Sequence, residues 1–163
     1  RLIQDKVWEG IQDGRMRKLA LQITKHCPER DGQCEAKAIY DYIKKRVRYT
    51  GDVAPVAMGA GGPVEAIDFF QSAPRTLEFG GGDCDDHVAL GAVLMSLNGI
   101  TTRLRVTAEQ MFADWGHIYP VVGLPKLSPT KWVAADTTLP GSRFGVEVPF
   151  AKNRDYVVKD YPA

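Results

Sequence analysis

The sequence lacks the long runs that would assign it to a membrane or nucleic-acid-binding class. Its longest strongly apolar stretch, VALGAVLMSL at residues 88–97, is about half as long as a membrane helix requires. It has no run of basic residues, and 21 Lys and Arg nearly balance 20 Asp and Glu. Neither a membrane nor a nucleic acid is therefore expected as a partner.

Cysteine is also scarce, with three in 163 residues. Cys27 and Cys34 bracket the polar stretch CPERDGQC, and Cys84 stands apart from them. One disulfide and one thiol would suit an oxidising compartment, whereas three thiols would suit a reducing one. The sequence leaves both arrangements open, and it indicates neither the compartment nor the oligomeric state.

Paired metal ligands are missing as well. His26 lies beside Cys27, but the spacing H-C-x6-C lacks the paired ligands of a zinc site. The three acidic residues around Cys84 do not match a calcium loop. We therefore expect no metal and no other cofactor. A thiol-redox or metal site built from Cys27, Cys34 and Cys84 stays open as an alternative.

What the chain does contain is ordered, with helical patterns first and strand patterns later. Apolar residues recur at helical spacing in four segments, residues 2–11, 15–25, 34–47 and 84–97. Four later segments resemble strands: 103–107, 117–123, 131–136 and 156–159. This order predicts an α+β fold with helices on one face of an antiparallel sheet. Between the two halves, the glycine-rich stretch 51–64 is expected to form a loop, either a substrate lid or a surface linker.

The junction GGGDCDDHVAL, residues 80–90, places a thiol at a predicted helix start. Asp83 is a good N-cap, so Cys84 falls in the first turn. A helix N-terminus stabilises anions, which favours the thiolate over a thiol of pKa about 8.5 and also stabilises an oxyanion. Apolar residues share the side of Cys84 and are expected to face inward: Val88, Gly91, Ala92 and Met95. The alternative is a cysteine that serves only as a small buried hydrophobe.

Two strand ends supply partners for such a thiol. A thiolate nucleophile needs a base, and the base needs an orienting group. His117 opens HIYPVVG and Asp136 ends KWVAAD, so antiparallel pairing of these strands would make the two residues neighbours. We expect the helix carrying Cys84 to cover the same face of the sheet. Pro120 removes a ladder donor, so its strand is expected to lie at an edge there, or to be bulged.

Together, GGGDCDDHVAL, GHIYPVV and KWVAADTT resemble the transglutaminase-like superfamily of papain-like cysteine enzymes. The upstream piece FFQSAPRTLEFGGGDC also looks like that family's approach to its cysteine, and the resemblance covers residues 36–138. It implies a central helix that bears the cysteine and packs on an antiparallel sheet. By resemblance, Cys84 is the nucleophile, His117 the base and acid, and Asp136 the orienting acid.

Three further residues are candidates for supporting roles. Gln71 could help an oxyanion hole, although the backbone amide of Cys84 is the stronger donor. Trp115 precedes His117 by two residues and could line the acyl pocket, or it could only pack at the strand start. His87 is a candidate second base or substrate contact, while a polar residue on a partly exposed side of the helix is the simpler interpretation.

The expected function is a cysteine-dependent amide hydrolase, a peptidase or amidase acting on a protein or peptide through a thioester acyl-enzyme. A cross-linking transglutaminase that uses an amine in place of water is one alternative. A non-catalytic assembly or binding module that retains the fold is another. Residues 1–35 are expected to form a helical extension packed on the core, and residues 36–163 the catalytic domain.

Overall fold

The computed structural model describes residues 2–50 and 72–158. The glycine-rich stretch 51–64, which the sequence predicts to be a loop, and Gln71 lie outside the described residues. The helices are α1 (Leu2–Gln12), α2 (Gly14–Thr24), α3 (Gly32–Arg46), α5 (Ala73–Phe79) and α6 (Cys84–Leu97). The strands are β1 (Arg48–Tyr49), β2 (Gly81–Gly82), β3 (Thr102–Ala108), β4 (His117–Leu124), β5 (Lys131–Ala134) and β6 (Lys152–Val157). The predicted α+β class is confirmed.

One four-stranded sheet carries the second half of the chain. Its order is β5-β4-β3-β6, and every neighbouring pair is antiparallel. The first three predicted strands are confirmed, although β5 ends at Ala134 and not at Asp136. The last strand, Lys152–Val157, begins four residues earlier than expected. β1 and β2 form a separate parallel pair beside the start of α6.

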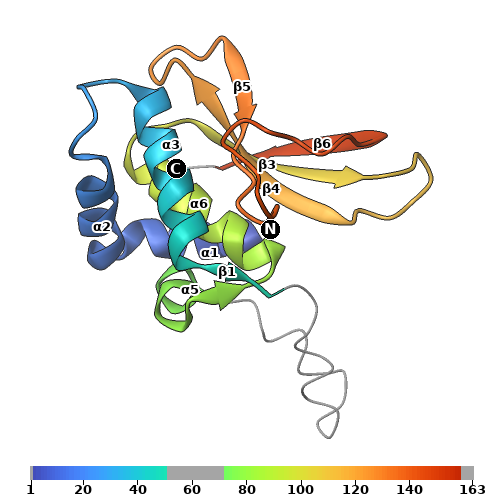
Figure 1. Ribbon diagram of the computed structural model, residues 1–163, viewed down its shortest axis with the longest axis horizontal. Helices are drawn as coiled ribbons and strands as arrows, with labels where there is room; N and C mark the ends of the chain where they lie inside the picture. The colour runs from blue at the N-terminus through green and yellow to red at the C-terminus, as the bar shows by residue number, and fades with distance from the viewer. Residues whose placement is uncertain (1, 51–71, 159–163) are drawn as a thin grey trace, which may run out of the picture.

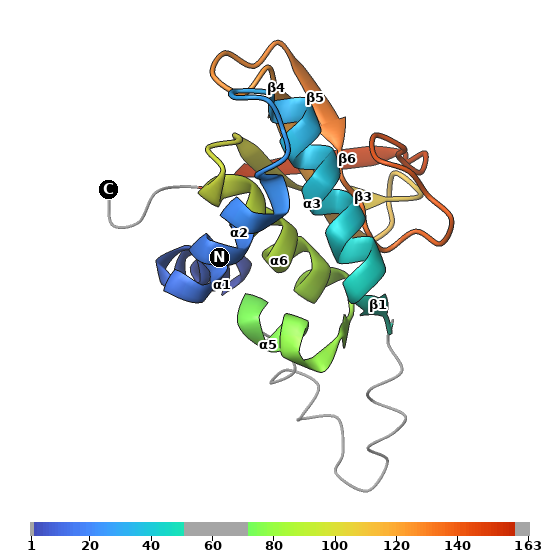
Figure 2. The same cartoon turned by 60° about the vertical axis from the view of Figure 1, so that its left-hand side comes forward.

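Helix α6 occupies the middle of the molecule. Figures 1 and 2 show the sheet on one side of it and helices α1, α2, α3 and α5 around the others, and each of these helices contacts α6. Every residue from Asp86 to Met95 is buried. The prediction of a single inward face was therefore too narrow, because a helix that is apolar on all sides is buried on all sides. The central helix bearing the cysteine and packed on an antiparallel sheet is confirmed.

The sheet buries different residues on its two faces. Ile118, Val122 and Leu124 of β4 join the main core with α6. Tyr119 and Val121 belong to a second, smaller cluster on the other face. His117 alternates with Ile118, so it belongs to the face that α6 does not cover. The expectation that α6 covers the face bearing His117 is therefore wrong.

Pro120 lies where β4 loses its β5 neighbour, so the expected edge is present at this position although β4 is an inner strand of the sheet. β4 lies between β5 and β3, and Pro120 pairs with Leu104 in regular register. The carbonyl of Pro120 accepts from the backbone nitrogen of Ala135, and in an antiparallel ladder the nitrogen of a residue faces the same neighbour as its carbonyl. The β4–β5 pairing ends at Val121 and Ala134, so the missing donor of Pro120 falls at the end of this ladder.

The first two helices pack on the same core. Val7, Met16 and Ala20 are buried members of the α6 cluster. A Cβ built on Gly10 would lie 2.6 Å from Cγ2 of Val93, so α1 crosses α6 at close range. The boundary between an extension and a catalytic domain at residue 36 stays a prediction. Within the described residues, none of the helices has the length and apolar character needed to span a membrane.

Gly82 is a position where the backbone approaches α6 too closely for a side chain. A Cβ there would lie 2.6 Å from the Cβ of Asp86 and 2.9 Å from its Oδ2. We expect Gly82→Ala to lower the free energy of unfolding by about 1–3 kcal/mol through overpacking, measured by urea denaturation. Gly14→Ala is the matched control, because nothing lies within 4 Å of its Cβ position. Equal stabilities for the two variants would contradict this account.

Candidate active site

The N-terminus of α6 is fixed by a reciprocal pair of side chains. Oδ1 of Asp83 accepts from the backbone nitrogen of Asp86 at 3.1 Å, and Oδ2 of Asp86 accepts from the backbone nitrogen of Asp83 at 3.2 Å. This capping box satisfies two backbone donors at once. Burial raises the pKa of the Asp83 carboxyl, and repulsion from Asp86 adds to the increase. The capping box fixes the start of α6, and Cys84 is the first residue of this helix.

Cys84 lies at the boundary between core and surface. Its side chain is half-buried and packs against the main hydrophobic cluster. It sits at the end of α6 where the helix dipole is positive, which favours a thiolate. Oδ1 of Asp85 lies 4.0 Å from Sγ, and a carboxylate at this distance opposes the thiolate. The nucleophile predicted from the sequence is therefore placed between two opposing electrostatic influences.

His117 and Asp136 are brought together by the pairing of β4 and β5. The register aligns Val121 with Ala134, so β4 continues past the end of β5 toward His117. The chain leaving β5 places Asp136 beside it, with Nε2 of His117 2.7 Å from Oδ2 of Asp136. The side chain of Asp136 is 2% exposed and that of His117 is 24% exposed. In this imidazole–carboxylate pair, the carboxylate of Asp136 is therefore buried and the ring of His117 is partly exposed.

Thr138 completes this pair and was missed from the sequence. Its hydroxyl donates to Oδ1 of Asp136 at 2.6 Å, and its backbone nitrogen donates to the same oxygen at 3.0 Å. The hydroxyl also lies 3.2 Å from Nε2 of His117. The signal was present in the order Asp136-Thr-Thr138, because aspartate commonly binds the backbone two residues further on.

The electrostatics of Asp136 follow from these contacts. Burial alone would raise its pKa, but hydrogen bonds from His117 and Thr138 outweigh burial and hold the pKa below its ordinary value. Asp136 is therefore ionised at neutral pH. An ionised carboxylate keeps the proton of neutral His117 on Nε2, which leaves Nδ1 as the acceptor nitrogen. The imidazole is thus oriented to accept a proton at Nδ1.

One pocket joins the cysteine to the histidine. Its volume is about 320 Å³, and Cys84 and His117 both line it. Trp115 lines the same pocket and is 42% exposed. Nζ of Lys152 lies 4.7 Å from the centre of the Trp115 ring, a cation–π contact that holds the indole from the outside. Trp115 therefore lines the same pocket as Cys84 and His117, and its role in substrate binding stays a prediction.

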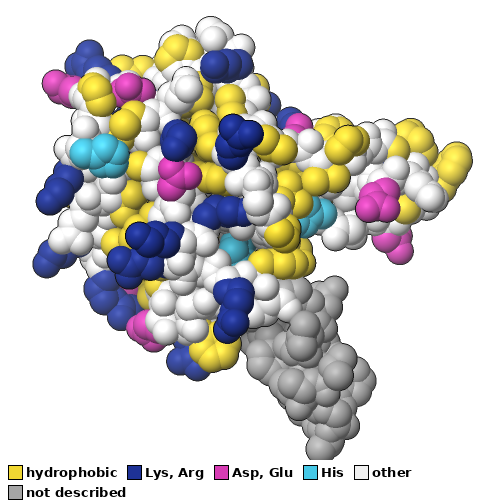
Figure 3. All heavy atoms as spheres, in the orientation of Figure 1, with side chains coloured by type: hydrophobic (Ala, Val, Ile, Leu, Met, Phe, Trp, Pro, Cys, Tyr) yellow, Lys and Arg dark blue, Asp and Glu magenta, His cyan; other side chains and the backbone are white. Residues whose placement is uncertain are grey.

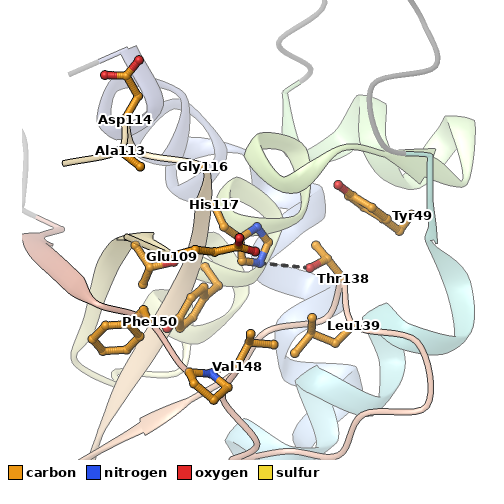
Figure 4. A pocket seen from close by; sticks show the side chains of 13 residues that line it. Tyr49, Glu109, Ala113, Asp114, Gly116, His117, Thr138, Leu139, Val148 and Phe150 are labelled. Carbon is orange, nitrogen blue, oxygen red and sulfur yellow. Dashed lines mark hydrogen bonds between the residues drawn. The ribbon is translucent and has the colours of Figure 1, made fainter. Parts of the chain in front are cut away.

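A second pocket, of about 440 Å³, is also lined by His117 (Figure 4). His117 and Thr138 form one wall, joined by the hydrogen bond drawn there. Val148 and Phe150 give the pocket an apolar part, and Glu109 is one of its two acidic residues. His117 therefore lines both pockets, and of these two only the smaller is also lined by Cys84.

His87 is buried, which corrects the expectation of a partly exposed position. It is 2% exposed because α6 is covered on every side. Nδ1 lies 2.7 Å from Oγ1 of Thr137, and among the described residues Nε2 has no hydrogen-bond partner. Burial lowers the pKa of His87, although the backbone of Arg48 opposes this effect. The ring therefore contacts Thr137, the residue after Asp136, from the interior of the protein. The predicted contact of His87 with substrate stays a prediction.

One group of side chains in the described part of the chain has the composition of a metal site. The ligand atoms of His26, Cys27 and Cys34 lie within 4.8 Å of one another. Cys27 and Cys34 are joined in a disulfide, which answers the question left open by the sequence and occupies both sulfurs. Cys84 lies outside this group, at the start of α6. The alternative site built from all three cysteines is not assembled.

Comparisons with known proteins agree with the fold described above. A family model described as the transglutaminase-like superfamily matches residues 17–137. A "putative protease" from Parabacteroides distasonis aligns with a TM-score of 0.56 and 16% identity, over 82% of this chain and 28% of that chain. A structure described as "a TGase" aligns with a TM-score of 0.52 and 16% identity, over 93% of this chain and 35% of that chain.

These two structural matches support a conclusion about the fold only. At 16% identity they show the fold, and the chain spans only 28% and 35% of the length of the two solved structures. No curated protein matches the chain. The roles of the individual side chains therefore depend on the geometry described above.

The depressed pKa of Asp136 predicts a contribution to acid stability. Because the unfolded state binds the proton more readily, this stabilisation is present above the ordinary pKa of 3.8 and is lost as pH falls through the lower folded value. We expect the difference in melting temperature between the wild type and Asp136→Asn to shrink from pH 5 to pH 2.5. Asp114→Asn, at an exposed position, is the control. A difference that stays constant with pH would contradict the assignment.

Proposed function

The chain belongs to the transglutaminase-like superfamily, and from this membership and the site geometry we propose that it is a cysteine-dependent amide hydrolase. Cys84 is the nucleophile, His117 the general base and acid, and Asp136 the orienting carboxylate. One observation carries the proposal. Cys84, at the N-terminus of α6, lines the same pocket as His117, and Nε2 of that histidine is 2.7 Å from Asp136.

In the first step, Nδ1 of His117 takes the thiol proton and Sγ of Cys84 attacks an amide carbonyl carbon. A C–S bond forms, and negative charge develops on the carbonyl oxygen. The positive end of the α6 dipole lies beside this oxygen and stabilises the charge. Gln71, predicted as a further oxyanion donor, lies outside the described residues. A cysteine that served only as buried packing would not need to line a pocket with a carboxylate-bound imidazole.

In the second step, the imidazolium returns its proton from Nδ1 to the leaving nitrogen, and the C–N bond breaks. The acyl group remains on Cys84 as a thioester. Asp136 stays ionised throughout, which agrees with its lowered pKa, and it stabilises the imidazolium. Thr138 holds the carboxylate by two hydrogen bonds, so the carboxylate and the ring keep one relative orientation.

In the last step, His117 removes a proton from water, whose oxygen attacks the thioester carbon. The C–S bond breaks, a carboxylic acid is released, and the imidazolium returns its proton to the sulfur of Cys84. The substrate we propose is a peptide bond or a carboxamide in a protein or peptide, with no cofactor. An amine in place of water would give a new amide, so the acceptor decides between hydrolysis and cross-linking. The products distinguish the two outcomes directly.

The test is to identify products and the acyl-enzyme together. We expect incubation with a peptide library to give new carboxyl ends, and an acid quench to leave an acyl mass on the peptide containing Cys84. Cys84→Ala should remove both signals while its melting temperature stays within a few degrees of the wild type. Incorporation of an added primary amine would instead identify amine transfer.

Cys84→Ser is the conservative comparison, because a hydroxyl replaces the thiol in the same position. It should retain the fold and lose nearly all turnover, because a hydroxyl gives up its proton to an imidazole far less readily than a thiol does. Full activity in Cys84→Ala would rule out the proposed mechanism. A wild-type protein that turns over no library member would favour the non-catalytic binding module.

A further inference from the structure

A third pocket, of about 410 Å³, lies beside the proposed active site. It is formed by the end of α3, by β1 and by the loop that follows Asp136. Four basic residues line it: Lys44, Lys45, Arg46 and Arg48. Figure 3 shows Lys and Arg side chains gathered on the face of the molecule where α3 lies. None of the described residues that line this pocket is acidic. We call it the basic pocket.

We propose that the basic pocket binds a carboxylate of the substrate, an Asp or Glu side chain close in sequence to the amide that Cys84 attacks. The inference rests on the proposed function and names the substrate class, an acidic peptide. It concerns a site separate from the thiol and imidazole, so it can be tested by binding alone.

The charge of the pocket is not neutralised within the described part of the chain. No carboxylate of those residues forms an ion pair with the four basic residues. Nζ of Lys44 donates to the carbonyl oxygen of Leu139, and the guanidinium of Arg46 lies 5.3 Å from the Tyr42 ring. Lys126, by contrast, is paired with Glu35 at 2.7 Å. The four positive charges are therefore available to an anion from outside.

The position of the pocket connects it to the reaction. Tyr49 and Thr138 line both the basic pocket and the 440 Å³ pocket that adjoins His117. The hydroxyl of Thr138 also binds Asp136. A peptide that runs from the basic pocket through the 440 Å³ pocket would reach His117, which also lines the pocket of Cys84. The carboxylate would then help to position the amide for attack.

His87 supports the wall of the basic pocket from the interior of the protein. Nδ1 of this buried ring lies 2.7 Å from Oγ1 of Thr137, and the ring centre lies 6.0 Å from that of Tyr49. Thr137 and Tyr49 both line the pocket. The buried ring therefore holds Thr137 by a hydrogen bond and packs against Tyr49 before any ligand arrives. A preorganised wall lowers the entropic cost of binding.

The dipole of α3 explains only part of this charge. Basic residues in the last turn complement the helix C-terminus, and that accounts for Lys44, Lys45 and Arg46. It does not account for Arg48, which follows the helix on β1 and lines the same pocket. A net charge of +1 and a compact pocket fit one or two carboxylates better than the long backbone of a nucleic acid.

The experiment measures binding to the Cys84→Ala protein, so that turnover is not required. Two rhodamine-labelled pools of randomised decapeptides serve as probes, one with two central Glu residues and the other with Gln at the same positions. Fluorescence anisotropy gives the dissociation constants. We expect the Glu pool to bind about tenfold more tightly, as for one charge-assisted contact, and the preference to weaken as salt is added.

A pair of double variants makes the result specific. Lys45→Gln with Arg48→Gln should remove the preference for Glu, because both residues line the basic pocket. Arg17→Gln with Lys18→Gln removes the same charge from exposed positions on α2 and should leave the preference unchanged. Melting temperatures of both variants confirm that the fold is retained.

Three results would overturn the inference. Equal binding of the two pools would show that the pocket takes no carboxylate. Equal losses in both double variants would show a general effect of net charge. Stronger competition by inorganic phosphate or a short single-stranded DNA than by the Glu pool would assign the pocket to a phosphate. Failure of turnover with a retained preference for Glu would overturn the proposed function and would leave the basic pocket as a binding site for an acidic peptide that is not a substrate.

Discussion

The burial of α6 on every side is the constraint on which the rest of this structure depends. From Asp86 to Met95 the helix meets either the sheet or another helix, so its polar groups can reach the surface only near its ends. At the N-terminus the Asp83–Asp86 capping box satisfies the backbone, and Gly82 allows the preceding chain to pass close to Asp86. The position of Cys84 is therefore fixed, and it lies where a pocket borders the hydrophobic core.

The acid–base pair has a separate origin, in the sheet. The register of β4 and β5 makes β4 the longer strand at one end, and the chain leaving β5 places Asp136 beside His117. His117 does not lie on the face that α6 covers. The thiol and the imidazole line one pocket because each occurs at an end of its element. Any shift of α6 along its axis, or of one residue in the strand register, would separate them.

Much of this arrangement could be predicted from local sequence patterns. Helical and strand periodicity placed most elements, and the capping signal before Cys84 gave the start of α6 to the residue. The His117–Asp136 contact could be expected because antiparallel pairing across a short connection leaves few registers. The burial of His87 could not, because it depends on four other helices packing around α6. The place of Pro120 on an inner strand depends on where its neighbour ends, and the Cys27–Cys34 disulfide depends on the path of the loop between α2 and α3.

The central claim is that Cys84 and His117 act as a coupled nucleophile and base. The most direct measurement is the rate of alkylation of Cys84 by iodoacetamide against pH, assigned by mass spectrometry, in the wild type and in His117→Ala. The account predicts that Cys84 reacts as a thiolate well below its reference pKa of about 8.5 and loses this reactivity in the variant. A profile that matches an ordinary thiol, or one that the variant leaves unchanged, would contradict the account.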